Sequence, residues 1–166
     1  MTDRLEFICA NAPRLKRPFH YTACGLGNVY LLSGVKSEKD QEYGPVVTIE
    51  RTQDLHRAIA LQLIHMERKL SGSEFRFLRK LMNQTQADLA RVMKVDVQTI
   101  ANYEKKGNIP GPSQQLMRIF AYVHLLPEEA SAKAAKSIAL DGNLREHLPL
   151  KELRKITQNW REYAPA

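Results

Sequence analysis

Residues 85–107, TQADLARVMKVDVQTIANYEKKG, decide the fold, because two short helical patterns follow one another there with almost no interval. The patterns are TQADLARVM and VQTIANYEKK, and residues 94–96 alone connect them. Two helices joined so closely must cross steeply, and the small side chain of Ala90 permits this approach. Asp96 is placed to cap the second helix, and Gly107 is expected to end it. The predicted inward-facing residues are Leu89, Ala90, Met93, Ile100 and Tyr103.

The outward face of the second helix, Val97–Lys106, carries residues suited to reading DNA bases. Gln98 and Asn102 are four residues apart and therefore share one face of the helix. Each amide offers a donor and an acceptor that match adenine N7 and N6 in the major groove, and methyl groups can contact thymine. Taken alone, such amides are more typical of a solvated polar face, and it is their place in this two-helix motif that favours base contact. The predicted base-reading residues are Val97, Gln98, Thr99 and Asn102.

The same stretch resembles the XRE (Cro/C1-type) helix-turn-helix family of transcriptional regulators. That family's pattern runs Q-x-x-L-A, a short turn, and then Q-x-I-x-x-[YW]-E-x-G, and this chain departs from it at Lys94, where the family usually has glycine. The resemblance implies sequence-specific binding of double-stranded DNA through the recognition helix Val97–Lys106. It also implies that Gln86 meets a DNA phosphate and that Arg79 pairs with Glu104.

Further phosphate contacts are expected from basic and polar residues around the two helices. The start of the first helix favours an anion, because its backbone N–H groups are unpaired there. Lys105 and Lys106 have an alternative role as cations that satisfy the dipole at a helix end. The predicted phosphate-binding residues are Gln86, Lys94, Lys105, Lys106, Asn108 and Ser113.

Over a longer stretch the chain resembles regulators of the MqsA antitoxin-like group. The segments that carry this resemblance are YTACGLGNVYLL, LHRAIA and LSGSEFRFLRKLMNQTQADLA. Typical members carry N-terminal cysteine pairs for zinc, whereas this chain has only Cys9 and Cys24. We therefore expect no metal and no cofactor. An antitoxin that binds a protein toxin and represses its own operon is the alternative function.

The remaining segments are assigned from periodicity. Ser71 and Glu74 have the spacing of a capping box that opens the DNA-binding domain. Leu150 and Trp160 begin and end an apolar stripe, with Leu153 and Ile156, on an expected last helix. The predicted divisions are an N-terminal module at 1–52, a connecting helix at 53–70, the helix-turn-helix domain at 71–126, and C-terminal helices at 127–166.

The N-terminal module is expected to be a small β-hairpin. Residues 28–35 and 45–50 are short runs rich in β-branched and aromatic side chains, and the segment between them is polar and ends in Gly44. The stretch before residue 28, with prolines among basic residues, is expected to be irregular. The predicted fold is therefore mainly α-helical, α+β overall, with a lambda-repressor-like helix-turn-helix domain at its centre.

Composition and charge point to a regulator rather than to an enzyme. The net charge is +7, and residues 71–126 hold 8 basic against 4 acidic side chains. The sequence has no Gly-rich phosphate loop, no H-E-x-x-H and no G-x-S-x-G, so we expect no catalysis. It has no apolar run of membrane-span length and no signal-like N-terminus, so we expect a cytoplasmic protein. We predict a repressor that acts as a homodimer on a palindromic operator.

Overall fold

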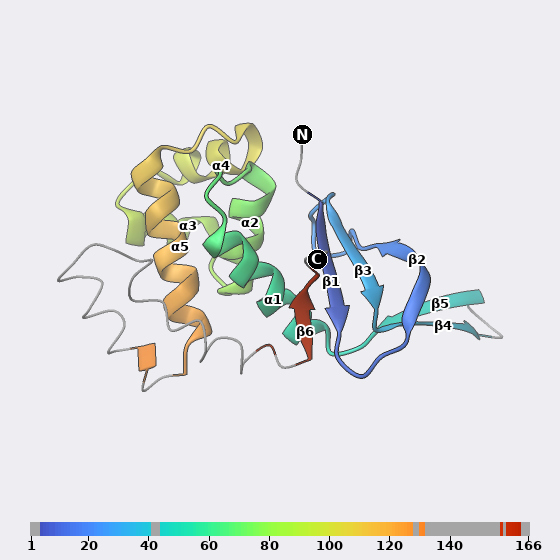
Figure 1. Ribbon diagram of the computed structural model, residues 1–166. Helices are drawn as coiled ribbons and strands as arrows, with labels where there is room; N and C mark the ends of the chain where they lie inside the picture. The colour runs from blue at the N-terminus through green and yellow to red at the C-terminus, as the bar shows by residue number, and fades with distance from the viewer. Residues whose placement is uncertain (1–3, 41–43, 128–129, 132–156, 158, 164–166) are drawn as a thin grey trace. The chain divides into compact units, whose positions relative to one another are not determined.

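The computed structural model describes residues 4–40, 44–127, 130–131, 157 and 159–163. The chain forms two compact units, one of residues 1–59 with 154–166 and one of residues 60–153. We call them the sheet unit and the helical unit. This grouping differs from the four consecutive segments predicted above, because a C-terminal strand joins the N-terminal sheet. Figure 1 shows the elements of both units.

The expectation of a mainly α-helical chain is wrong. The described residues form five helices and six strands in two sheets, which makes the fold α+β with a substantial β-rich part. The stretch before residue 28, expected to be irregular, contains two strands. The larger sheet has the order β2-β3-β1-β6, in which β1 runs parallel to β3 and the other pairs are antiparallel. Its strands are β1 (Leu5–Cys9), β2 (Arg14–His20), β3 (Val29–Ser33) and β6 (Trp160–Glu162).

Trp160 lies in a strand and is fully buried, so its assignment to a last helix is wrong. Its indole Nε1 donates a hydrogen bond to the carbonyl oxygen of Glu50 at 2.8 Å. The ring also lies against Gly34, where an added Cβ would be 2.8 Å from its carbon atoms. Leu150, Leu153 and Ile156, the other members of the predicted stripe, lie outside the described residues.

The predicted hairpin has the wrong first strand. Residues 29–33 belong to the larger sheet, and the polar segment after them forms the strand that pairs with residues 44–49. Gly34, with a φ of +73°, separates β3 from this second, two-stranded sheet. Because Lys36 to Lys39 all face solvent, their polar sequence resembles a loop although the backbone is extended. The two strands of this sheet are β4 (Val35–Asp40) and β5 (Gly44–Ile49).

The two helices predicted at residues 85–93 and 97–106 are present in the helical unit. The connecting helix α1 ends at His65, before the predicted boundary at residue 70, and its Leu55, Ile59 and Leu63 side chains are buried. In the helical unit α4 packs against α2 and α3, and α2 packs against α5. No helix among the described residues has both the length and the apolar character needed to cross a bilayer. The helices are α1 (Thr52–His65), α2 (Gly72–Leu81), α3 (Gln86–Met93), α4 (Val97–Lys106) and α5 (Gly111–Leu125).

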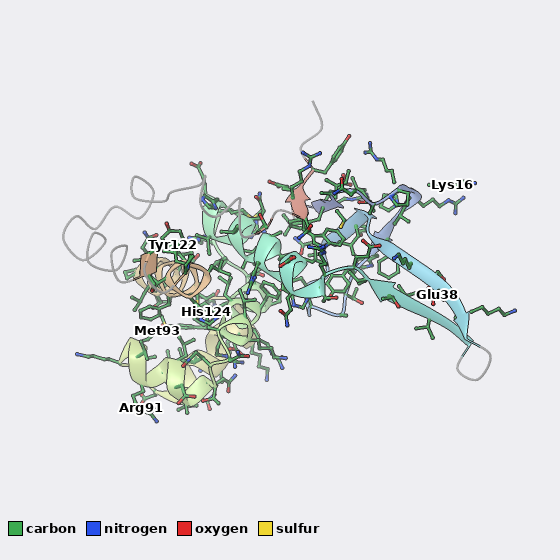
Figure 2. All side chains as sticks on the ribbon, turned by 90° about the horizontal axis from the view of Figure 1, so that it is seen from below. Lys16, Glu38, Arg91, Met93, Tyr122 and His124 are labelled. Atoms are coloured by element: carbon green, nitrogen blue, oxygen red, sulfur yellow. The ribbon has the colours of Figure 1, made fainter. Side chains whose placement is uncertain are left out.

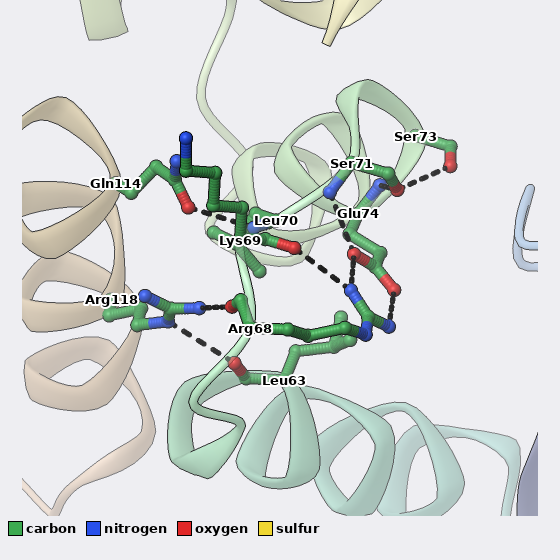
Figure 3. Close-up of polar contacts among 9 residues, drawn as sticks. All are labelled: Leu63, Arg68, Lys69, Leu70, Ser71, Ser73, Glu74, Gln114 and Arg118. Carbon is green, nitrogen blue, oxygen red and sulfur yellow. Dashed lines mark hydrogen bonds and ion pairs between the residues drawn. The ribbon is translucent and has the colours of Figure 1, made fainter. Parts of the chain in front are cut away.

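The connection between α1 and α2 is held by charged and amide side chains (Figure 3). Arg68 donates two hydrogen bonds, of 2.8 and 2.6 Å, to the buried carboxylate of Glu74. Gln114 on α5 accepts a hydrogen bond from the backbone N–H of Leu70 at 2.8 Å, and Arg118 donates to the carbonyl of Arg68 at 2.7 Å. These bonds fix the start of α2, against which α4 packs.

Candidate nucleic-acid interface

The first helix of the predicted motif, α3, begins at a complete capping box. The Thr85 hydroxyl accepts a hydrogen bond from the Asp88 backbone N–H at 3.1 Å, and the Asp88 carboxylate accepts one from the Thr85 N–H at 3.3 Å. This reciprocal pair satisfies two backbone donors that a helix start would otherwise leave open. Leu89 and Ala90 then face the core as predicted.

The turn between α3 and α4 is built around Lys94, which adopts the left-handed conformation with a φ of +53°. The Val95 N–H donates to the Ala90 carbonyl at 3.0 Å, which closes the end of α3. A lysine thus takes the conformation for which the family's glycine is suited. Asp96 occupies the N-cap position of α4, but its side chain makes no capping hydrogen bond, so the predicted carboxylate cap is wrong.

Replacing Lys94 by glycine is expected to raise the free energy of unfolding of the helical unit by about 1 kcal/mol. A left-handed residue with a Cβ costs roughly 1–2 kcal/mol, and glycine avoids that cost while losing some backbone entropy. Chemical denaturation followed by circular dichroism measures the change. Lys94→Ala is the control, because it removes the same charge but keeps a Cβ. Equal stability of the two variants would contradict the expected strain.

Behind α4, a buried network joins three helices. The Arg79 guanidinium on α2 donates to both carboxylate oxygens of Glu104, at 2.5 and 3.1 Å, which agrees with the predicted pair. The Gln86 side-chain amide, at the start of α3, donates to the same carboxylate at 2.9 Å. Burial alone would raise the pKa of Glu104, but the hydrogen bonds from Arg79 and Gln86 and the nearby positive charges lower it overall. Glu104 therefore stays ionised and holds both partners.

The network has a consequence for the predicted phosphate contact of Gln86. An amide nitrogen carries two hydrogens, and Glu104 uses one of them. The second hydrogen can still donate to an anion, with the side chain already held in place. The sequence resemblance assigned the contact to Gln86 alone, whereas the structure adds Glu104 as the residue that orients it.

The outer face of α4 presents the predicted base-reading residues. Val97 is 47% exposed and Gln98 is exposed, while Thr99 and Asn102 are half-buried. The Gln98 amide nitrogen lies 3.5 Å from the Asn102 side-chain oxygen, which places both amides side by side. On the opposite face Ile100 is fully buried. The structure thus brings these amides together on a helix with a fixed inner face.

Basic side chains surround this face at the helix ends. Lys94 is exposed at the end of α3, Lys105 and Lys106 are exposed in the last turn of α4, and Asn108 is exposed in the loop that follows. Ser113, in the first turn of α5, is half-buried. Arg91 on α3 projects away from the helical unit (Figure 2).

Two residues near the motif were missed by sequence reasoning. The exposed guanidinium of Arg76 lies 4.0 Å from the Glu104 carboxylate. Its spacing of three residues from Arg79, which puts both on one face of α2, is the sequence signal that could have identified it. Gly72 was missed because nothing local marks a close approach. A Cβ at Gly72 would lie 2.3 Å from the carbonyl oxygen of Glu104, so α2 and α4 meet there backbone to backbone.

The cysteines of the sheet unit show no metal arrangement. Cys9 is buried and Cys24 is half-buried, and desolvation raises the pKa of both thiols. Within the described ranges, no group of three His, Cys, Asp or Glu side chains is placed to hold a metal ion.

The candidate interface is therefore the outer face of α4 together with the start of α3 and the cations at the ends of these two helices. Family models, curated proteins and solved structures offer no match to this chain.

Proposed function

We propose that the chain is a sequence-specific regulator that binds double-stranded DNA in the manner of XRE (Cro/C1-type) proteins, with α4 as the recognition helix. The observation that carries this proposal is the pair of adjacent amides, Gln98 and Asn102, on the outer face of α4, whose opposite face is buried through Ile100. The major groove admits an α-helix, and amide side chains match the donor and acceptor pattern of adenine. Val97 supplies an exposed apolar group for thymine methyls.

Phosphate contacts orient α4 in the groove. Gln86 stands at the N-terminus of α3, where the helix dipole favours an anion, and Glu104 holds its amide in position. Lys94, Lys105 and Lys106 add positive charge at the helix ends, which strengthens binding to any sequence. Phosphate contacts position the protein, and base contacts supply the specificity.

The proposed protein acts in the cytoplasm as a homodimeric repressor and carries out no catalysis. One recognition helix reads only a few base pairs, and each good bidentate contact supplies about 1–3 kcal/mol of discrimination. Two half-sites one helical turn apart, about 34–36 Å, double the sequence that is read. A palindromic operator is the DNA that such a dimer fits.

Substituting Gln98 and Asn102 together by alanine is expected to abolish sequence preference while general DNA binding remains. The preferred duplex is first selected from a random pool and then titrated beside a scrambled duplex at several salt concentrations. Each lost contact corresponds to roughly a 5- to 150-fold loss of discrimination. The slope of affinity against salt is expected to stay unchanged, because phosphate contacts remain.

Gln115→Ala is the matched control, since it removes an exposed amide from α5 instead of α4. It is expected to bind both duplexes as the wild type does. If the double variant kept its preference for the selected duplex, base reading by α4 would be refuted. If the wild type bound both duplexes equally, sequence-specific regulation itself would be refuted.

A further inference from the structure

The β4–β5 sheet has only two strands, and its strand β5 has one free edge in the described part of the chain. An isolated two-stranded ribbon is marginally stable in water, and an unpaired strand edge is a template for a further strand. Both Val46 and Val47 of β5 are exposed, at 41% and 46%. Figure 2 shows this ribbon with Glu38 on β4.

The register of the ribbon defines which backbone groups lie on the free edge. Glu50 donates its N–H to the Gly34 carbonyl at 2.9 Å, so this pair is a hydrogen-bonded one. Hydrogen-bonded and non-hydrogen-bonded pairs alternate along an antiparallel ladder. Counting back along β5, Pro45, Val47 and Ile49 therefore turn their backbone groups away from β4. Pro45 fits this position, because proline has no N–H to contribute to the ladder.

These edge groups are complementary to themselves. If two copies of β5 pair antiparallel about a two-fold axis at Val47, each Val47 exchanges two hydrogen bonds with Val47 of the partner subunit. Each Ile49 N–H then donates to the carbonyl of Pro45 of the partner subunit. Pro45 has no donor for the Ile49 carbonyl in return, but that carbonyl already accepts from the Thr52 hydroxyl at 3.2 Å. The backbone groups that Pro45, Val47 and Ile49 turn outward are thus all paired.

Charge also favours a second copy as the occupant. Residues 44–49, GPVVTI, contain no charged side chain, so antiparallel self-pairing places no like charges opposite each other. Glu50, the acidic residue that directly follows β5 in the sequence, is paired with Lys36 at 2.9 Å. Two-fold pairing also places the exposed Val47 side chains together, which removes apolar surface from water.

We propose that β5 is the homodimer surface, and that two chains join through it into a four-stranded sheet of order β4-β5-β5-β4. This inference rests on the proposed function, in which a dimer is needed to read two half-sites. The interface is small, so the dimer is weak in free solution. DNA with two half-sites strengthens it, because two linked binding events act at a high effective concentration.

The test measures self-association of the full chain by sedimentation over a range of protein concentrations. Val47→Lys places two like charges opposite each other at the two-fold axis and is expected to weaken dimerisation by about tenfold or more. Val47→Glu is expected to do the same. An equimolar mixture of the two variants is expected to dimerise again, because the opposed charges then attract. Such a rescue shows that each variant folds and that β5 faces β5.

Ser37→Lys is the control, since Ser37 pairs with Val47 inside the ribbon and lies on β4, away from the two-fold axis. It adds the same charge and is expected to leave the dimer intact. Unchanged dimerisation of Val47→Lys, or a mixture that stays monomeric, would overturn the proposal, as would a wild type that stays monomeric at every concentration. Specific DNA binding is titrated separately, so a dimer without sequence preference refutes the proposed function and leaves this surface standing.

Discussion

Replacing Gly72 by alanine is expected to lower the free energy of unfolding of the helical unit by roughly 3 kcal/mol. The new Cβ would lie 2.3 Å from the Glu104 carbonyl oxygen and 2.8 Å from the Tyr103 carbonyl oxygen. Both are backbone atoms of α4, so no side chain can rotate away to make room. The helices must move apart, which also disturbs the bond of Arg79 to Glu104.

Urea unfolding followed by circular dichroism at helical wavelengths measures this change. Gly111→Ala is the matched control, because nothing lies within 4 Å of a Cβ there and its φ is not positive. That variant is expected to be as stable as the wild type or more stable by a few tenths of a kcal/mol. Equal unfolding midpoints for the two variants would show that α2 and α4 do not approach as closely as described. We also expect weaker specific DNA binding for Gly72→Ala, since α2 packs against α4, the proposed recognition helix.

Replacing Trp160 by alanine is expected to destabilise the sheet unit by about 3–5 kcal/mol. The indole is fully buried, and its loss would leave a large cavity beside Gly34. It would also remove the hydrogen bond to the Glu50 carbonyl. Calorimetry measures the change. Trp160 is the single tryptophan of the sequence, so its replacement removes tryptophan fluorescence as a probe, whereas the heat of unfolding can still be measured.

Two further variants separate packing from other effects at this strand. Trp160→Phe keeps most of the apolar volume and is expected to lose less than Trp160→Ala. Arg161→Ala changes the neighbouring exposed residue of β6 and is expected to stay within about 0.5 kcal/mol of the wild type. A Trp160→Ala protein with wild-type stability would mean that β6 does not close the sheet.

Features of the described helices between residues 71 and 107 could be predicted because the residues that determine them lie close together in the sequence. The Ser71–Glu74 capping box, the buried Ile100 and the left-handed Gly107 each follow from residues within a few positions of one another. The resemblance to the XRE family predicted the pairing of Arg79 with Glu104, and the two side chains form an ion pair. Base reading by the outer face of α4 is a prediction that the DNA titrations above test.

The sheet unit could not be predicted because some of its paired strands lie far apart in the sequence. Cys9 pairs with Trp160, although the whole sequence of the helical unit lies between them. No periodicity in either segment indicates that partner. The polar strand β4 lacks the alternation of a half-buried strand, since its described side chains between Lys36 and Lys39 all face solvent. Gly72 shows the same limit within the helical unit, because only the folded α4 reveals the need for a missing side chain.

The position of β6 in the chain also bears on the order of events during synthesis. The ribosome synthesises a chain from its N-terminus at about 5–20 residues per second, and domains begin to fold as they emerge. The helical unit is continuous in sequence, so all of it is synthesised before β6. The larger sheet contains the first strands to be synthesised, but it is complete only when β6 is added, and β6 is synthesised after α1 to α5. The part of the chain made first is therefore the last to be completed, and its edge at β1 stays open until then.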